Sequence, residues 1–173
     1  MKMNFSIKTI ILGLSFLLII SCAIELPLEE QVTWYEARVA AIIDGDTIQI
    51  QFIDDSIPGG CERSERVRLI GVDTPELFTE PPEFFAQEAK DFSNELYLTN
   101  VLLEFDPISA RRDRYGRLLA YIYKDFGSIS INEQLITEGF GYYYGIFAFD
   151  PERMTEFQNT ENYARSNHKG LWK

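Results

Sequence analysis

Residues 43–53 read IDGDTIQIQFI, a turn followed by strict alternation of apolar and polar side chains. Asp44-Gly45 is a strong turn signal. Alternation with period two is the pattern of a half-buried strand. Its apolar face is formed by Ile48, Ile50 and Phe52. Asp46 has the same parity, so its carboxylate begins the buried face, where it is costly unless paired or bound to metal.

The rest of the chain from Trp34 onwards predicts four more strands and three helices. The strands are expected at 34–43, 66–72, 101–105 and 117–123, which are rich in aliphatic and aromatic residues. One helix, opened by Pro81-Pro82, carries an apolar stripe of Phe85, Ala89, Phe92 and Leu96. The others are expected at 131–138, stopped by Gly139, and at 151–167, with Pro151 at its start and Gly170 at its end. This order predicts an α+β fold, a five-stranded Greek-key barrel of the OB type with three helices.

The third strand runs into RLIGVDTPE, residues 68–76, where acids and an arginine gather. One interpretation is structural, because Asp73 or Thr74 could cap a short helical turn that begins at Pro75. That interpretation leaves Arg68 unexplained in an otherwise apolar strand. A further stretch, DRYGRLLAY at 113–121, is by itself compatible with a hairpin turn that has a basic rim.

Taken together, these side chains suit phosphoryl chemistry. Asp46 and Asp73 could hold a hard divalent cation through oxygen. Arg68 and Arg117 could clamp a phosphate with paired donors. Glu76 could take a proton from water or orient it. The cation and the arginines would neutralise charge that grows on the phosphate in the transition state.

The chain resembles the staphylococcal nuclease (thermonuclease) family. The matching segments are IDGDT (43–47), RLIGVDTPE (68–76), DRYGRLLAYIY (113–123) and KGLW (169–172), in the order of the family. The resemblance covers about residues 34–173. It implies an OB-type barrel with three helices. It also implies calcium-dependent hydrolysis of DNA and RNA that leaves 3′-phosphate ends.

The resemblance assigns roles to individual residues. Asp46 and Asp73 match the calcium-binding carboxylates, and Thr74 would offer its backbone carbonyl to the ion. Arg68 and Arg117 match the two arginines that bind phosphate in the family.

Glu76 matches the glutamate proposed as general base, which either removes the proton or orders the water. Tyr115 matches a tyrosine of the substrate pocket, and we expect Arg114 beside it to contact substrate. In the aromatic segment 139–150, Phe147 aligns with a substrate-stacking tyrosine. The alternative is that rings of this segment belong to the core.

The N-terminus predicts export. Lys2 and Lys8 precede an apolar run at 10–20, which is shorter than the roughly 20 residues needed to span a bilayer. A basic start, a short apolar core and a small residue before the break describe a signal peptide, residues 1–21. The run ends in Ile-Ile-Ser-Cys, which resembles a bacterial lipoprotein signal with Cys22 as the lipidated residue. The alternative is a plain secretory signal.

These features divide the chain into a signal peptide, a lipidated tether at 22–33 and a nuclease domain at 34–173. We expect a monomer held through the lipid on Cys22 to a membrane of the bacterial cell envelope, outside the cytoplasm. Cys61 is then left without a partner, and we interpret it as incidental. His168 is expected on the surface.

The net charge of −11 argues against a general nucleic-acid-coating protein, which would usually be basic. Seven of the ten arginines nevertheless fall in 63–68 and 111–117. Few lysines elsewhere mean weak long-range attraction to polyanions, so substrate affinity should depend more on calcium. The alternatives to an enzyme are a non-catalytic module of the same fold that binds nucleic acid or protein, and a structural envelope lipoprotein that binds no calcium. The complete set of two aspartates, two arginines and a glutamate favours the enzyme.

Overall fold

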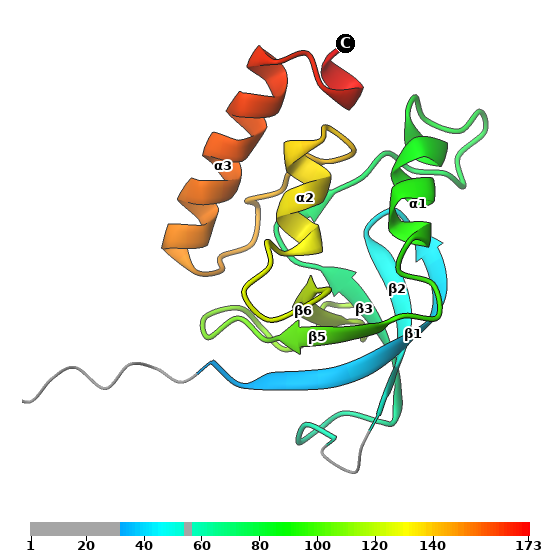
Figure 1. Cartoon of the computed structure of the whole chain (residues 1–173), viewed down its shortest axis with the longest axis vertical. Helices are drawn as coiled ribbons and strands as arrows, with labels where there is room; N and C mark the ends of the chain where they lie inside the picture. The colour runs from blue at the N-terminus through cyan, green and yellow to red at the C-terminus, as the bar shows by residue number, and fades with distance from the viewer. Residues whose placement is uncertain (1–31, 54–56) are drawn as a thin grey trace, which may run out of the picture. The chain divides into compact units, whose positions relative to one another are not determined.

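A computed structural model of the chain describes residues 32–53 and 57–173 (Figure 1). The predicted signal peptide, Cys22 and most of the predicted tether lie outside the described residues. In the described part of the chain, no helix is both long enough and apolar enough to cross a membrane.

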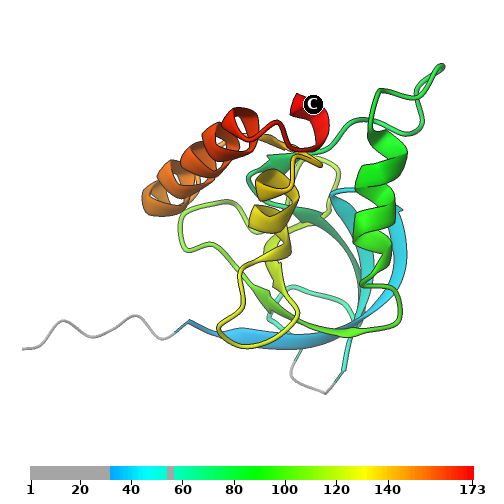
Figure 2. The same ribbon diagram turned by 45° about the horizontal axis from the view of Figure 1, so that its top comes forward.

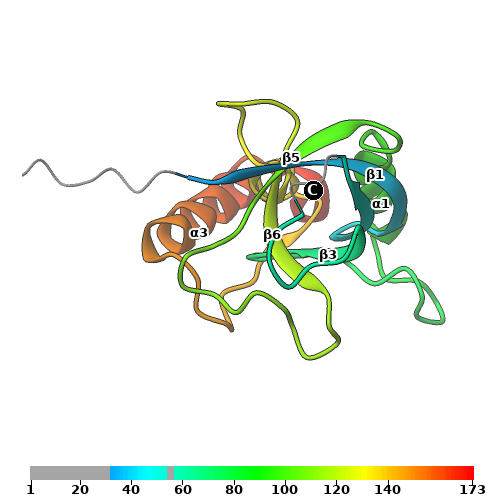
Figure 3. The same cartoon turned by 90° about the horizontal axis from the view of Figure 1, so that it is seen from below.

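Five strands close into a barrel in the order β1-β2-β3-β6-β5. Their bounds are β1 Trp34–Asp44, β2 Thr47–Phe52, β3 Ser64–Leu69, β5 Asn100–Glu104 and β6 Leu118–Tyr123. Neighbours pair antiparallel except β3 and β6, which are parallel. Figure 3, seen from below, shows these strands with the helices behind them. The predicted five-stranded OB-type barrel in the α+β class is confirmed.

The long strand β1 pairs along one part of its length with β2 and along another with β5. Its register against β2 shifts between Val39 and Ala41 and again between Ile42 and Asp44. Such bulges bend a strand and increase its twist. The bending lets one strand close the barrel and then deliver its last residues to the turn that carries Asp46.

The barrel interior is filled by the alternating apolar positions predicted for β2, and Ile48, Ile50 and Phe52 are all buried. Asp46 follows the same parity and is only 6% exposed. Tyr121 from β6 and Phe157 pack edge to face, with ring centroids 6.2 Å apart. The core is therefore continuous from the barrel into the helical layer.

Three helices, α1 (Ala86–Asn94), α2 (Ile131–Thr137) and α3 (Pro151–Ser166), lie above the barrel, with α2 between the other two in Figures 1 and 2. Ser130 caps α2 by accepting from the Glu133 N–H at 3.1 Å. Asp150 caps α3, with Pro151 at the first helical position. Gly139 ends α2 as predicted, with φ of 73°.

The start of α1 differs from the prediction, which placed it at Pro81-Pro82. The helix begins at Ala86, and the prolines lie in a loop that is closed by the Glu83 N–H donating to the Glu76 carbonyl at 3.1 Å. Phe85, with φ of 72°, adopts a left-handed backbone that cannot be helical. The apolar stripe still packs as expected, since Ala89 and Leu96 are buried.

The end of α3 also differs. The helix was predicted at 151–167 and is observed at Pro151–Ser166, but it is not Gly170 that ends it, because the backbone already turns at His168, with a φ of 51°. Gly170 instead opens a short 3₁₀ helix, η1 (Gly170–Trp172), whose Leu171 N–H donates to the Gly139 carbonyl at 2.8 Å. His168 is exposed as expected.

The predicted third strand at 66–72 is interrupted. Gly71 has a φ of 76°, so β3 ends at Leu69 and a new short strand, β4 (Val72–Asp73), begins in another sheet. Its partner is β7 (Tyr142–Tyr143), with Asp73 opposite Tyr142. This two-stranded sheet was not predicted, and it carries one of the expected metal ligands.

A buried carboxylate outside the candidate site ties the barrel to α3. Asp106 accepts from the N–H groups of Ile108 and Ser109, at 2.8 and 2.7 Å, from Tyr121 Oη at 2.7 Å and from the Asp150 N–H at 2.9 Å. Burial raises the pKa of Asp106, but these hydrogen bonds outweigh it, so that its pKa lies below the usual value.

We predict that Asp106→Asn lowers the free energy of unfolding at pH 7 by about 1–3 kcal/mol, because the amide cannot accept from all these donors. The folded-state pKa is depressed, so the advantage of the wild type is complete above about pH 4 and is lost as pH falls through the folded pKa. Urea denaturation at several pH values measures both effects. Asp91→Asn, at an exposed position of α1, is the control and should change stability by less than about 0.5 kcal/mol. Equal stability of the two variants would contradict the prediction.

Candidate active site

The predicted motifs meet at one end of the barrel. Arg68, near the end of β3, contacts both carboxylates, with Nη1 3.2 Å from Asp46 Oδ2 and Nη2 2.6 Å from Asp73 Oδ1. Arg117, just before β6, donates from Nη1 to Thr47 Oγ1 at 3.2 Å. Residues that are far apart in the sequence thus form one cluster around the turn between β1 and β2.

Asp46 is the buried member of this cluster. Its Oδ2 accepts from the Thr74 N–H at 2.8 Å and from Thr74 Oγ1 at 3.0 Å. Its Oδ1 accepts from Thr47 Oγ1 at 3.0 Å. The helix-cap interpretation of 73–75 is wrong, because no helix follows and Thr74 donates to Asp46 instead of starting a helical turn.

The approach of Thr74 to Asp46 depends on Gly45. A Cβ atom on Gly45 would lie 2.7 Å from Thr74 Oγ1, closer than Cβ atoms come to other atoms in real proteins. The Gly45 carbonyl also accepts from Ser93 Oγ of α1 at 2.5 Å. The Asp-Gly turn is therefore held between α1 and the segment that carries Thr74.

Arg68 is held by backbone as well as by carboxylates. Its Nη1 donates to the carbonyls of Leu69 and Val72, at 3.0 and 2.5 Å. Asn132 fixes the same turn from α2, donating from Nδ2 to the Ile70 carbonyl at 2.8 Å. Asn132 is fully buried, and sequence reasoning missed it, since its only distinguishing property is burial.

Arg117 is oriented by a carboxylate in its own turn. Asp113 accepts from Arg117 Nε at 2.7 Å and from the N–H groups of Tyr115 and Arg117 at 2.9 and 3.0 Å. The guanidinium groups of Arg114 and Arg117 lie 4.7 and 5.4 Å from the centre of the Tyr115 ring. The ring itself is 68% exposed, so its free face is available for stacking. The i, i+4 spacing of Asp113 and Arg117 is the signal that could have revealed this pair.

The aromatic segment at 139–150 splits between core and surface. Tyr144 donates its N–H to the Gly71 carbonyl at 2.9 Å, which fixes the segment beside Asp73. Phe149 is buried against Phe157, whereas Phe147 is 67% exposed. Phe149 therefore belongs to the core, and the substrate role of Phe147 stays a prediction.

Glu76 is exposed, and Glu83 fixes its backbone by accepting from the Glu76 N–H through Oε2 at 2.9 Å. Burial and then repulsion from Asp44, Asp46, Asp73 and Glu83 raise the pKa of Glu76. Its carboxylate is therefore a stronger base than an isolated glutamate.

The pKa of Asp73 is also raised, by burial and by its acidic neighbours, although Arg68 opposes the change. Burial raises the pKa of Asp44 as well. This end of the barrel is thus an acidic cluster of Asp44, Asp46, Asp73, Glu76 and Glu83.

Within residues 32–53 and 57–173, no group of three His, Cys, Asp or Glu side chains is arranged so that it could hold a metal ion. The donor chemistry nevertheless fits a hard divalent cation. Two carboxylates, Asp46 and Asp73, lie within contact of one guanidinium, and mutual repulsion in the acidic cluster would be relieved by a dication. The residues present are therefore compatible with a metal of the calcium or magnesium type.

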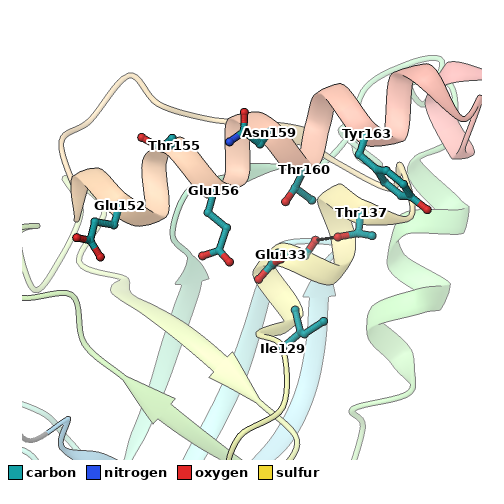
Figure 4. Close-up of a pocket in the computed structure, with 9 residues that line it drawn as sticks. All are labelled: Ile129, Glu133, Thr137, Glu152, Thr155, Glu156, Asn159, Thr160 and Tyr163. Atoms are coloured by element: carbon teal, nitrogen blue, oxygen red, sulfur yellow. Dashed lines mark hydrogen bonds between the residues drawn. The ribbon is translucent and has the colours of Figure 1, made fainter.

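Away from this cluster, a hollow with a volume of about 660 Å³ lies between α2 and α3 (Figure 4). Its charged lining residues are Glu133, Glu152 and Glu156. Repulsion from Glu156 contributes to a raised pKa of Glu133, after burial. This groove would repel a polyanion, so it is not a second place for a phosphate-bearing ligand.

Comparison with known proteins points to the same family as the sequence motifs. The family model described as "Staphylococcal nuclease homologue" matches residues 66–173, a range that includes Arg68, Asp73, Glu76 and Arg117 but not Asp46. An uncharacterised protein of Methanocaldococcus jannaschii is 30% identical over 159 residues, covering 80% of this chain and 72% of that protein.

Two relatives are named as nucleases. The thermonuclease of Staphylococcus hyicus is 40% identical over 106 residues, which are 59% of this chain and 55% of the relative. The endonuclease YncB of Bacillus subtilis is 35% identical over 135 residues, which are 75% and 58% of the two chains. The matches thus span little more than half the length of these two nucleases.

We predict that Gly45→Ala lowers the free energy of unfolding by about 1–3 kcal/mol, because the new methyl group must push Thr74 away from Asp46. Gly59→Ala is the matched control, since a Cβ there meets no atom within 4 Å. Both substitutions reduce the conformational entropy of the unfolded chain equally. The difference between their unfolding free energies in urea therefore measures the clash of the new methyl group with Thr74. A Gly45→Ala protein as stable as the control would show that the turn can relax.

Proposed function

Because the chain belongs to the staphylococcal nuclease family, we propose that it is a calcium-dependent nuclease that hydrolyses phosphodiester bonds of DNA and RNA and leaves 3′-phosphate ends. One observation carries the proposal. Arg68, Arg117 and Glu76 gather at the end of the barrel where Asp46 and Asp73 lie.

In this proposal the acidic residues hold the cation. Asp46 and Asp73 would bind calcium through carboxylate oxygens, with the backbone carbonyl of Thr74 as a further ligand. Bound calcium would neutralise charge on the scissile phosphate. The acidic cluster would repel a phosphate when no cation is bound, which supports strict dependence on the metal. Calcium tolerates irregular oxygen shells better than magnesium does, and this favours calcium at a site with one buried and one half-exposed carboxylate.

The two arginines would act on the phosphate. A guanidinium presents paired donors that match two phosphate oxygens. Arg117 is already oriented by Asp113, which leaves little conformational entropy to lose on binding. Arg68 is held by two carbonyls and is only 12% exposed, so its charge acts where water is largely excluded.

Glu76 would remove a proton from the attacking water or orient that water. Its raised pKa brings it closer to neutrality, where a general base is most effective. Glu83 would act as a positioning residue, because it fixes the backbone of Glu76 from the other end of the loop. Tyr115, Arg114 and Phe147 would bind the nucleotides on either side of the cleaved bond.

We also propose that the enzyme is a lipoprotein anchored through Cys22 to the bacterial cell envelope, outside the cytoplasm. The support is the sequence of residues 1–22, with its basic start, short apolar run and Ile-Ile-Ser-Cys. Such an enzyme would degrade extracellular nucleic acid. The fold needs no disulfide, since Cys61 is a free thiol, so the domain is suited to either redox environment.

We predict that Glu76→Gln lowers kcat on single-stranded DNA by about 10²–10⁴-fold at saturating calcium, because it removes the base but keeps the shape of the side chain. Wild-type cleavage should stop with a chelator and should yield 3′-phosphate ends. Phosphatase sensitivity of end-labelled products identifies those ends. Glu80→Gln, an exposed glutamate of the same loop, is the control and should keep near-wild-type kcat. A folded, calcium-binding wild type that cleaves neither DNA nor RNA would shift the interpretation to a binding module.

For the anchor, we predict that Cys22→Ser moves the protein from the membrane fraction to the soluble exported fraction, because the lipid has no attachment point. Cell fractionation with metabolic labelling by a fatty acid measures this directly. Cys61→Ser removes the other cysteine and should leave both fractionation and labelling unchanged. Wild-type protein that is soluble and unlabelled would contradict the anchor and leave the plain secretory signal.

A further inference from the structure

The outer wall of the barrel beside the candidate site carries a strip of polar side chains. In the register of β2 and β3, Gln49 lies opposite Arg66, and Gln51 lies opposite Ser64. On the other side of β2, Arg38 of β1 lies opposite Gln51. The alternate residues along these strands, such as Val67 and Ile50, are buried, so the polar set faces solvent.

This strip begins at the site itself. Arg68 and Arg66 are alternate residues of β3 and therefore share a face, about 6.6 Å apart along the strand. Arg38 lies two strands across and one row further, roughly 12 Å from Arg66 by the ordinary strand spacings. Glu36, two residues before Arg38 on the same face of β1, ends the strip with an opposite charge.

Two arginines of the strip, Arg38 and Arg66, have no acidic partner among the described residues. Most other arginines are engaged by acids, for example Arg112 by Glu65 at 2.6 Å and Arg153 by Glu104 at 2.7 Å. Arg38 and Arg66 are exposed, and neither guanidinium group forms a hydrogen bond or ion pair within the described ranges 32–53 and 57–173. In a chain of net charge −11, two cations left without acidic partners on one face favour an anionic ligand there.

We propose that this strip, formed by Arg38, Gln49, Gln51, Ser64 and Arg66, binds the sugar-phosphate backbone of a single-stranded nucleic acid that continues from the bond cleaved at the site. The inference rests on the proposed nuclease function and extends it to a longer binding path. Three arginines placed one after another from Arg68 to Arg38 can each contact a phosphate of one strand. Ser64 Oγ donates to the Ile50 carbonyl at 3.3 Å and accepts from Gln49 Nε2 at 3.0 Å, which holds Gln49 in place. The Gln51 amide and the second N–H of the Gln49 amide can donate to phosphate and sugar oxygens.

A single strand fits better than a duplex for two reasons. The strip offers one line of cations rather than two parallel lines at the spacing of a groove. The exposed ring of Tyr115 at the site end can stack only on an unpaired base. Barrels of the OB type bind oligonucleotides on the face of their second and third strands, which is the face of β2 and β3 here.

The test compares Arg38→Gln/Arg66→Gln with the wild type on two substrates. One is a single strand of oligodeoxythymidylate of about 16 nucleotides, and the other is a dinucleotide with one phosphodiester bond. We expect KM for the long strand to rise about tenfold and the slope of log KM against log salt to fall by about 1.4, for two lost phosphate contacts. Values for the dinucleotide should stay unchanged, because it ends at the site.

Lys124→Gln/Lys169→Gln is the matched control, since it also removes two positive charges but from lysines already paired with Glu95 and Glu138. It should leave KM for both substrates near the wild-type value. An unchanged KM for the long strand in the arginine variant, or an equal rise with the dinucleotide or in the lysine control, would overturn the proposal.

Failure of the nuclease function is recognised separately. If the wild type cleaves neither substrate, binding of a fluorescein-labelled strand of the same length is measured by anisotropy in a chelator. Weaker binding by the arginine variant than by the lysine control then supports the strip without any turnover. Equal binding by the two variants overturns it.

Discussion

The burial of one carboxylate, Asp46, constrains the whole end of the barrel. A carboxylate in the apolar face of a strand is costly unless donors surround it, and here Thr47, Thr74 and Arg68 supply them. To bring Thr74 within reach, the chain must break after β3 and begin again as β4. To let Thr74 approach, residue 45 must lack a side chain. Gly45 in the segment 43–47 and the strand break before Thr74 in the segment 68–76 thus serve the same purpose, which is to supply hydrogen-bond donors to the buried Asp46 carboxylate.

Negative charges outnumber positive charges around Asp46, and this excess affects both metal binding and proton transfer. Arg68 is the only cation in contact with both Asp46 and Asp73 among the described residues. Burial, and then repulsion within the acidic cluster, raises the pKa of Glu76. A bound dication would relieve this repulsion. The same imbalance would favour metal binding, and the raised pKa would favour proton removal by Glu76.

Sequence reasoning found the parts of the site that follow local rules. The parity of Asp46 with Ile48 and Ile50 revealed a buried carboxylate, and Arg68 was conspicuous in an apolar strand. It failed where a contact between distant residues decides local structure. Pro is tolerated at the first position of a helix, which led to the expected start at Pro81-Pro82, but the pairing of Glu76 with Glu83 holds that segment as a loop.

Asn132 shows the same limit from the side of the core. Its sequence context is that of an ordinary polar helix residue, yet its amide donates to the carbonyls of both Ile70 and Ala120 and its Oδ1 accepts from the Ile122 N–H. Two-residue strands such as β4 and β7 are likewise too short for any periodic pattern. Their existence follows from the turn that Asn132 and Gly71 create, which no local signal reports.

An acidic chain that handles a polyanion must separate its charges in space. At physiological ionic strength, interactions between exposed charges fade over about 8 Å, so distant acids on the helices repel a bound strand only weakly. Charges in contact with the strand are screened far less. Seven arginines lie in two short segments, and the acids nearest to several of them, such as Asp113 and Glu65, serve to orient guanidinium groups. Where no acid accompanies an arginine, as with Arg66 and Arg38, the chain retains positive charge at the surface, and in the proposed function that is where a strand would be held. The net charge therefore governs how fast a polyanion approaches, while the placement of these arginines governs where it binds.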